Sequence, residues 1–150
     1  MNSKKRIGII VSICVVIVCA LAIVHNLTRV KVPVNNIAII SEGETLYADL
    51  DNLSLSPVSG EVTNKKKETK TITGDGILLR DILAENHVSD YSSVKVISDD
   101  EYSAEVSKEE VESTDNAYLL VEDSAARLYV FGDFDSKRNV LNVKRIEIVK

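Results

Sequence analysis

The chain opens with a long apolar segment that contains no charged side chain between Ile7 and Val24, a run of 18 residues. The hydrocarbon core of a bilayer is roughly 30 Å thick, and about 17–25 apolar residues in a helix cross it. The segment is largely apolar at every helical position, so a helix formed by it has no face suited to water. The pattern therefore predicts a transmembrane helix over residues 7–27, preceded by a short N-terminal stretch over residues 1–6.

Positive charge is unevenly placed around this segment. Three cations at residues 4–6 precede it, and Arg29 and Lys31 follow it. Cations concentrate on the cytoplasmic side of membrane helices, which predicts a cytoplasmic N-terminus and an extracytoplasmic domain on a single-pass cell-membrane protein. A cleaved secretory signal has the same charge order, and residues 20–22 (Ala-Leu-Ala) offer a small-residue cleavage site. The sequence therefore leaves open an uncleaved anchor and a cleaved signal peptide.

After a tether over residues 28–35, where Pro33 discourages regular structure, the pattern changes to short β-branched and alternating segments that are typical of strands. Residues 45–50 fit either a strand or a short helix. Near the C-terminus the alternating apolar residues change from odd-numbered positions (Leu141, Val143) to even-numbered positions (Ile146, Ile148). This change predicts a bulge or a short turn near Lys144. The predicted strands cover residues 36–41, 53–59, 62–72, 94–98, 102–106, 117–121, 127–131, 140–143 and 145–149.

Two short helices interrupt these strands. Residues 77–83 place four leucine and isoleucine side chains on one helical face, after a turn predicted at Gly74-Asp75-Gly76. Ser107 with Glu110 three residues later forms a capping box that predicts a second helix. Because the elements do not follow a βαβ order, residues 36–150 are predicted to form an α+β domain with a mixed or largely antiparallel sheet and two or three short helices.

Charge and cysteine usage narrow the function classes. Residues 33–150 hold all 23 acidic side chains but only 13 of the 18 lysines and arginines, which leaves this part of the chain with a net charge of −10. Nucleic-acid binding requires the opposite sign of charge, so nucleic acid is not expected as a partner. Cys14 and Cys19 both lie in the apolar segment, where they fill space in a membrane helix. The domain therefore has no disulfide, no thiolate metal ligand and no cysteine nucleophile.

Two acidic clusters could hold a cation. Asp133 and Asp135, with Ser136 and Asn139, are spaced like calcium ligands, but the loop lacks the glycine and the closing glutamate of a calcium-binding loop. Residues 99–101 (Asp-Asp-Glu) are more typical of a charged hairpin tip than of a metal site. Both clusters are interpreted as solvated loops, and no metal-binding residue is predicted.

Basic residues and histidine give no catalytic set. The lysines at residues 65–67 could meet lipid headgroups or an acidic partner, but lysines also protect an exposed strand from aggregation. His87 is the only histidine after the apolar segment, and it is interpreted as a surface loop residue. We predict no catalytic residue, and cofactor-binding residues remain unassigned.

Residues 58–150 contain five segments that resemble, in the same order, the sulfite-oxidase-type molybdopterin-binding domain. They include a Thr-Gly pair followed by a leucine-rich helix, a strand with an acidic turn and a tyrosine, two further strands, and a closing Val-Lys-Arg-Ile-Glu segment. The five segments are residues 73–83, 94–103, 117–122, 127–133 and 143–148. The resemblance implies a trimmed relative of that domain, with the same type of α+β fold.

The resemblance also implies where a metal would be held, and there this chain departs from the family. In the family a cysteine thiolate ahead of the glycine and helix element binds molybdenum, whereas residues 61–73 here contain lysines and threonines and no cysteine. Without a soft thiolate the metal cannot be held in that manner. We therefore expect no molybdenum catalysis and no bound cofactor, with molybdopterin as the one cofactor left open.

These observations lead to one leading hypothesis and two alternatives. The leading hypothesis is a membrane-tethered extracytoplasmic binding or interaction domain that is not an enzyme, attached through its N-terminal helix and able to meet an envelope protein partner. The first alternative is an oxidoreductase subunit that binds a molybdopterin cofactor. The second alternative is a structural protein of the cell envelope.

Overall fold

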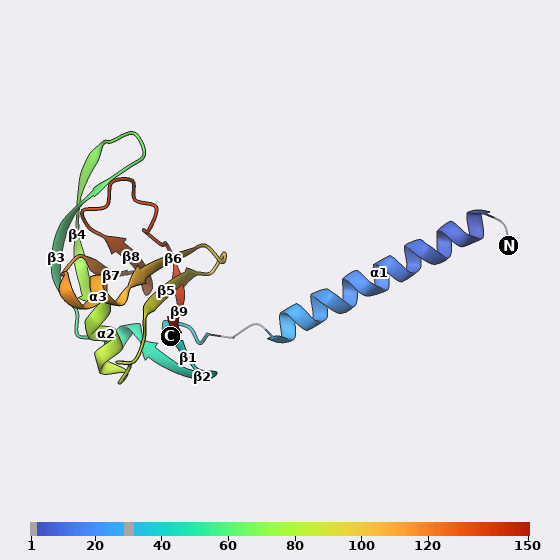
Figure 1. Ribbon diagram of the computed structural model, residues 1–150, viewed down its shortest axis with the longest axis horizontal. Helices are drawn as coiled ribbons and strands as arrows, with labels where there is room; N and C mark the ends of the chain where they lie inside the picture. Colours follow the sequence, from blue (N-terminus) through green and yellow to red (C-terminus); the bar gives the residue numbers. More distant parts are fainter. Residues whose placement is uncertain (1–2, 29–31) are drawn as a thin grey trace. The chain divides into compact units, whose positions relative to one another are not determined.

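The computed structural model describes residues 3–28 and 32–150 and divides the chain into two compact units, residues 1–31 and 32–150 (Figure 1). The first unit consists of helix α1 (Ser3–Thr28). The second unit contains all the strands and the remaining helices. Arg29 and Lys31, which follow the predicted transmembrane helix, lie outside the described residues.

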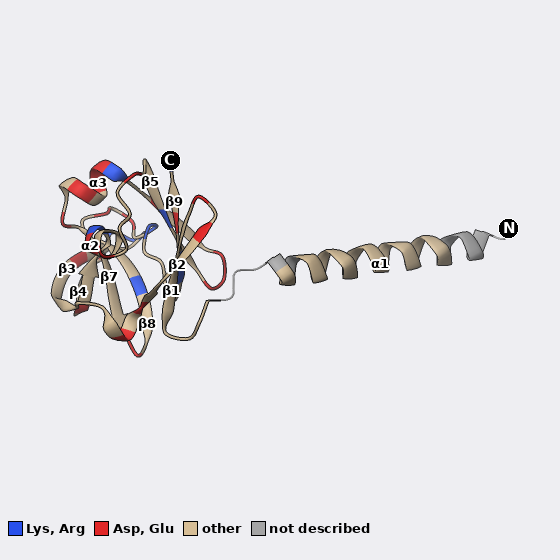
Figure 2. Ribbon diagram, turned by 90° about the horizontal axis from the view of Figure 1, so that it is seen from below, with Lys and Arg blue, Asp and Glu red and all other residues tan. Residues whose placement is uncertain are grey.

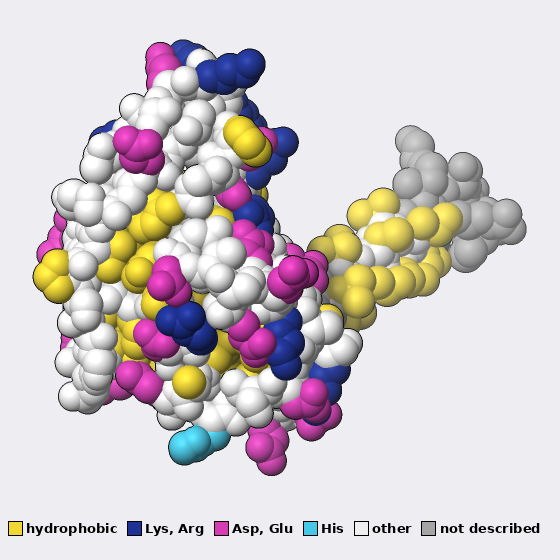
Figure 3. Space-filling view, turned by 60° about the vertical axis from the view of Figure 1, so that its left-hand side comes forward, with side chains coloured by type: hydrophobic (Ala, Val, Ile, Leu, Met, Phe, Trp, Pro, Cys, Tyr) yellow, Lys and Arg dark blue, Asp and Glu magenta, His cyan; other side chains and the backbone are white. Residues whose placement is uncertain are grey.

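Helix α1 exposes apolar side chains around its whole circumference. Every residue from Gly8 to Val24 is exposed, including Val16 and Leu21, and Figure 3 shows the apolar side chains on the visible face of this helix. Both cysteines lie in α1 and are exposed. Within the part of the chain that the structure describes, no helix combines the length and the apolar character needed to cross a membrane.

The second unit is an α+β domain, as the sequence predicts. Its elements in chain order are β1 (Asn36–Ser41), β2 (Glu44–Asp49), the 3₁₀ helix η1 (Leu50–Asn52), β3 (Ser56–Thr63), β4 (Thr69–Leu78), α2 (Leu79–Glu85), β5 (Ser93–Ser98), β6 (Ser103–Ser107), α3 (Lys108–Ser113), β7 (Ala117–Glu122), β8 (Ala125–Val130) and β9 (Val143–Val149). Of residues 45–50, which the sequence left open between strand and helix, residues 45–49 belong to strand β2 and Leu50 begins η1.

The strands form two sheets. The five-stranded sheet has the order β2-β1-β9-β5-β6 and is mixed, because β1 and β9 are parallel while the other pairs are antiparallel. The four-stranded sheet has the order β3-β4-β7-β8 and is antiparallel throughout. The predicted bulge is present at Lys144, since Ile97 pairs with Arg145 while the next residue, Ser98, pairs with Val143.

One apolar core lies between the two sheets and the helices. It is built from alternate residues of the strands, because successive strand side chains point to opposite faces. Side chains from β1, β5, β6, β7, β8, β9, α2 and α3 meet in it. The largest fully buried side chains are Ile37, Ile39, Leu79, Ile82, Leu83, Leu119, Leu128, Ile146, Val94, Val96, Val106 and Val111. This burial stabilises a domain that has no disulfide.

Two sequence predictions around β3 and β4 are wrong. The predicted strand over residues 62–72 is interrupted by a turn at residues 64–68, where the Asn64 side chain accepts hydrogen bonds from the backbone of Lys66 and Glu68. The predicted turn at residues 74–76 is instead the interior of β4. Asparagine caps a turn by bonding to nearby backbone, whereas the glycines are required by close packing of β4 against β7.

The predicted capping box at the start of α3 is formed only in part. The Ser107 hydroxyl accepts a hydrogen bond from the Glu110 backbone N–H at 3.3 Å. The Glu110 side chain does not return to Ser107, because it binds the guanidinium of Arg138 at 2.6 and 2.9 Å. A tertiary ion pair therefore replaces the second half of the capping box.

Replacing Ser107 with alanine is expected to lower the free energy of unfolding by about 1 kcal/mol, since it removes the N-cap acceptor of α3. Urea denaturation followed by far-ultraviolet circular dichroism measures this change. Ser107→Thr keeps the acceptor and is the matched control. Equal stability of the alanine and threonine variants would show that this cap contributes nothing.

Candidate functional site

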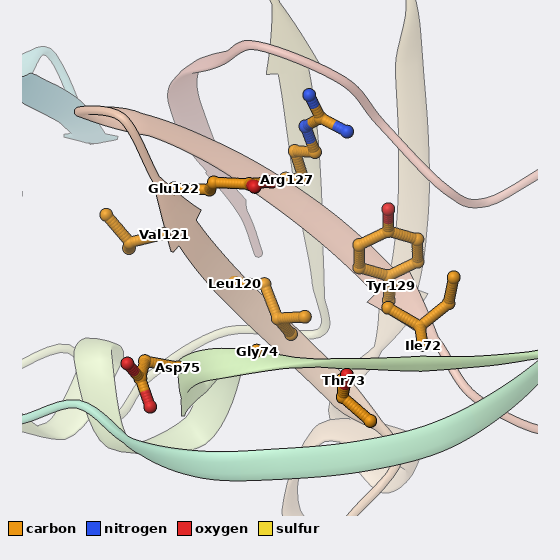
Figure 4. A pocket seen from close by; sticks show the side chains of 9 residues that line it. All are labelled: Ile72, Thr73, Gly74, Asp75, Leu120, Val121, Glu122, Arg127 and Tyr129. Atoms are coloured by element: carbon orange, nitrogen blue, oxygen red, sulfur yellow. The ribbon is translucent and has the colours of Figure 1, made fainter.

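A groove of about 230 Å³ lies where β4 separates from β7 and β8 in the four-stranded sheet (Figure 4). Strand β4 forms one wall, and β7 with β8 forms the other. The groove combines apolar, aromatic, glycine and charged residues. Its lining residues are Ile72, Thr73, Gly74, Asp75, Leu120, Val121, Glu122, Arg127 and Tyr129.

The groove exists because β4 pairs with β7 along only part of its length. The pairing covers Gly76–Leu78 opposite Tyr118–Leu120 and stops there. On its other side β4 pairs with β3 over eight residues, from Thr69 to Gly76. The N-terminal part of β4 therefore follows β3 and leaves β7, which opens a wedge in the sheet.

Two glycines allow the start of the wedge to close tightly. A Cβ atom on Gly76 would lie 2.9 Å from the carbonyl oxygen of Leu119, and one on Gly74 would lie 3.2 Å from Cδ2 of Leu120. Side chains at these positions would push β4 and β7 apart. With glycine, Leu120 packs against β4 and is only 6% exposed, so it forms the apolar floor of the groove.

An aromatic cluster lies on the same face of the sheet, beside the groove. The rings of Tyr129 and Phe131 are stacked with their centroids 6.1 Å apart, and Tyr118 lies 5.8 Å from Phe131. The Phe131 ring covers Gly60 of β3 so closely that an added Cβ would lie 2.4 Å from the ring. The Gly132 N–H also donates to the Glu61 carbonyl at 3.3 Å. The end of β8 thus reaches β3, and the four-stranded sheet curls around this cluster.

Arg127 is the cation of the groove. It projects from β8 to the same side as Tyr129 (Figure 4), and its position opposite Leu120 in the strand register places it over the groove floor. The residue is half-buried. Among the described residues, no carboxylate lies within salt-bridge distance of its guanidinium and no hydrogen bond to it is formed, nor does the Tyr129 hydroxyl have a hydrogen-bond partner there. Glu122 and Asp75 stand on the rim as exposed carboxylates.

Arg127 differs from the other arginines of the domain, which form ion pairs with carboxylates of the described residues. Arg80, Arg138 and Arg145 each bind one or two carboxylates. A half-buried guanidinium without a partner presents up to five N–H donors in a planar fork that matches a carboxylate or phosphate. The groove can therefore bind an anionic group next to an apolar or aromatic one.

The residues of the calcium-like loop are engaged within the protein. The Asp133 carboxylate binds Arg138, with 2.8 Å between Oδ2 and Nε, and Asp135 pairs with Lys137 at 2.6 Å. The Asn139 side chain accepts a hydrogen bond from the backbone of Val130 at 3.1 Å. Ser136 donates to the Thr63 carbonyl. Their oxygens hold the loop in place against β3, β8 and α3.

The other residues singled out in the sequence lie apart from the groove. In the acidic tip, Asp100 accepts hydrogen bonds from Ser98 and Tyr102, and Glu101 pairs with Arg145. His87 is exposed in the turn after α2. Among the described residues, no group of three or more histidine, cysteine, aspartate or glutamate side chains is arranged to hold a metal ion.

The lysines at residues 65–67 occupy the turn between β3 and β4, and Lys70 lies just after it. They form a basic tip, defined as these four lysines, at the upper end of the domain in Figure 3. Elsewhere, acidic residues are spread over the strands, turns and helices (Figure 2). The basic tip is therefore a positive region on a domain of negative net charge, whereas Arg127 lies in a groove that also carries Asp75 and Glu122.

Sequence reasoning did not single out Arg127, Tyr129 or Leu120. The spacing of two of them does indicate their face of the strand. Arg127 and Tyr129 alternate with the buried residues of β8 and therefore lie on its outer face. That outer face becomes a groove only through β4, which lies far away in the sequence. Comparison of the chain with protein-family models finds no match, and comparison with curated proteins finds none. The resemblance to the molybdopterin-binding domain remains a prediction.

Proposed function

We propose that this protein is an extracytoplasmic binding domain that α1 tethers to the cell membrane, and that its ligand occupies the groove between β4 and β8. One observation carries the binding function: Arg127 is half-buried in the groove and has no anionic partner among the described residues. Leaving a guanidinium partly desolvated without a partner costs free energy. A ligand that brings a carboxylate or phosphate to Arg127 and an apolar group to Leu120 offsets that cost.

The membrane tether is supported by the apolar segment itself. Residues 7–24 contain no charge, and the side chains described in α1 expose apolar surface on all sides. Such a surface is unfavourable in water and favourable in a bilayer. The position of the cations before the segment supports an N-terminus in the cytoplasm.

Catalysis with molybdenum is not part of the proposal, because the donor set does not fit it. Both thiols of the chain lie in α1 and none lies in the domain. The groove offers a guanidinium, which does not bind metal ions, together with a phenol, carboxylates and backbone carbonyls, whose oxygens are hard ligands. Residues of this kind bind a ligand by charge and hydrogen bonds and do not replace the soft thiolate of the resembled family.

Membrane tethering can be tested by fractionation of cells that produce the full chain. We expect the protein in the membrane pellet after alkaline carbonate extraction, and in the supernatant when Val15 and Val18 are both replaced by arginine. Each arginine at the centre of a membrane helix costs about 2.5–3.5 kcal/mol. The matched control replaces both residues with leucine and should remain in the pellet. Wild-type protein with an intact N-terminus in the supernatant would contradict the tether, and a shortened N-terminus would identify a cleaved signal.

Ligand binding in the groove can be tested with a simple probe that carries both an anionic group for Arg127 and an apolar group for Leu120. Phenylacetate is added to the ¹⁵N-labelled full chain in detergent micelles, and amide chemical shifts are followed by NMR. We expect shifts confined to β4, β7 and β8 with a Kd of about 1 mM, since a ligand of ten heavy atoms gains only a few kcal/mol. The neutral analogue phenylacetamide and the variant Arg127→Gln should each weaken binding about fivefold or more. Shifts that are scattered or insensitive to Arg127 would contradict the groove as the ligand site.

A further inference from the structure

The side of β4 that faces the groove is an open strand edge. Beyond the pairing at Gly76–Leu78, no strand of the described chain pairs with this side of β4. Thr71, Thr73 and Asp75 are all exposed, and two of them line the groove. An open edge of this kind is the template to which an extended peptide adds as a further strand.

The strand register identifies the backbone groups available on this edge. The Asn64 N–H donates to the Glu68 carbonyl at 3.0 Å, which marks these two residues as a hydrogen-bonded pair at the start of the β3–β4 ladder. Hydrogen-bonded pairs recur every second residue in an antiparallel ladder. The even-numbered residues of β4 therefore bond to β3, and the odd-numbered ones direct their N–H and C=O groups to the groove.

The opposite edge of the groove continues the same arrangement. In β7, Leu119 pairs with Ile77 of β4. The odd-numbered residues of β7 therefore direct their backbone N–H and C=O groups to β4, and the even-numbered residues direct theirs to β8. Val121 is the next odd-numbered residue and has no partner on β4. A strand that enters the groove would therefore find a continuous row of donors and acceptors on β4 and a further pair on Val121.

Charge selects the kind of strand that fits. Arg127 lies over the groove floor, and the basic tip lies at the end where β4 begins. At physiological ionic strength charges farther apart than about 8 Å are largely screened. Screening weakens the distant charges of the domain, so the charges of the groove and the basic tip matter most. Among these residues, Arg127 and the four lysines outnumber the two rim carboxylates, Asp75 and Glu122. A second copy that paired with this edge in parallel would bring lysines against lysines, which opposes that arrangement.

From this edge, its register and these cations we propose that the groove binds an extended acidic segment of a partner protein, which adds to β4 as an antiparallel or parallel strand. Its backbone bonds to Thr71, Thr73 and Asp75, and its acidic side chains meet Arg127 and the basic tip. This inference rests on the proposed binding function and specifies the class of ligand.

The direct test uses the synthetic peptide acetyl-EVEVEV-amide with the full-length ¹⁵N-labelled protein in detergent micelles. Binding is measured by NMR titration, and hydrogen exchange of the protein amides is measured with and without peptide. We expect slower exchange at Thr71, Thr73 and Asp75, because these N–H groups become bonded. The peptide acetyl-KVKVKV-amide, which keeps the strand propensity and reverses the charge, should bind at least about tenfold more weakly.

Two matched controls separate strand addition from attraction between charges. Two copies of the acidic peptide are prepared, one N-methylated at its odd-numbered residues and one at its even-numbered residues. Each copy keeps every charge but loses half of the backbone N–H donors. At least one of the two copies should bind about tenfold more weakly. In the protein, Thr73→Pro removes one N–H that is not used by β3, which an edge position tolerates, and it should also weaken peptide binding. Thr73→Val keeps the N–H and should bind as the wild type does.

The outcomes distinguish this inference from the proposed function. Strand addition is overturned, while phenylacetate binding stays intact, if the peptide does not bind. It is also overturned if both N-methylated peptides bind as tightly as the unmodified peptide and Thr73→Pro binds as tightly as the wild type. Loss of phenylacetate binding as well overturns the groove as a ligand site. Slower exchange at the three β4 residues together with charge selectivity supports the proposal, even where Thr73→Pro fails to fold.

Discussion

Replacing Gly60 with alanine is expected to lower the free energy of unfolding by about 2 kcal/mol, although alanine is normally the better residue within a strand. The added Cβ would lie 2.4 Å from the Phe131 ring, and such overpacking typically costs about 1–3 kcal/mol. Gly60 and Phe131 join β3 to the end of β8, so the clash opposes the curl of the four-stranded sheet. Urea denaturation measures the change in stability.

A double-mutant cycle gives this prediction its control. In the background Phe131→Ala the ring is absent, so Gly60→Ala should be neutral or stabilising by up to about 1 kcal/mol through reduced chain entropy. The coupling between the two positions should therefore be about 2–3 kcal/mol. Additive effects of the two substitutions would show that the ring does not limit the residue at position 60.

Replacing Arg138 with methionine is expected to cost about 2–3 kcal/mol. The guanidinium binds Glu110 of α3 through two hydrogen bonds and Asp133 of the loop after β8 through a further pair. These carboxylates are largely buried, with side-chain exposures of 22% and 18%. Removing one partner of a buried ion pair leaves an unpaired charge that is poorly solvated, which is strongly destabilising. Because water reaches part of this site, we expect a smaller loss of stability than for a fully buried pair.

Arg80→Met is the matched control for this loss. Arg80 binds Asp81 and Asp115, but its side chain is 39% exposed and its partners are more exposed still. Exposed ion pairs contribute about 0–1 kcal/mol. Thermal or urea denaturation should therefore separate the two variants clearly. Similar losses in both would contradict a special role for the Arg138 cluster.

The same cluster predicts how stability changes in acid. The hydrogen bonds from Arg138 hold the pKa of Glu110 below its ordinary value. A carboxylate with a lowered pKa stabilises the fold fully above the pKa of the unfolded chain, about 4.5, and loses this contribution as the pH falls through the lower folded value. The difference in unfolding free energy between wild type and Arg138→Met should therefore shrink below about pH 4.5. A difference that stays constant down to pH 3 would contradict this ion pair as its source.

Local patterns predicted much of the domain. The hairpins β5–β6 and β7–β8, the start of α3 after Ser107 and the bulge at Lys144 all follow from alternation and capping within a few residues. These features depend on short-range geometry, in which the sequence alone specifies which face of a strand is apolar.

The region around β4 shows where local patterns stop being informative. Gly74 and Gly76 are typical of a turn, yet they lie inside a strand because Leu119 and Leu120 of β7 approach them too closely for a side chain. The competing principle is close packing between strands distant in sequence, which overrides turn propensity. Conversely, the lysine-rich segment alternates like a strand but turns, because Asn64 bonds back to the chain.

The sequence by itself therefore determined the class of the fold, the faces of most strands, the apolar N-terminal segment and the absence of a thiol in the domain. Only the tertiary structure decided that β4 leaves β7, that Arg127 lies beside Leu120 and Tyr129 in a groove, and that an edge of β4 is open. The reason is physical: alternation is set by the geometry of one strand, whereas a groove depends on the register and separation of strands that meet only after the chain has folded.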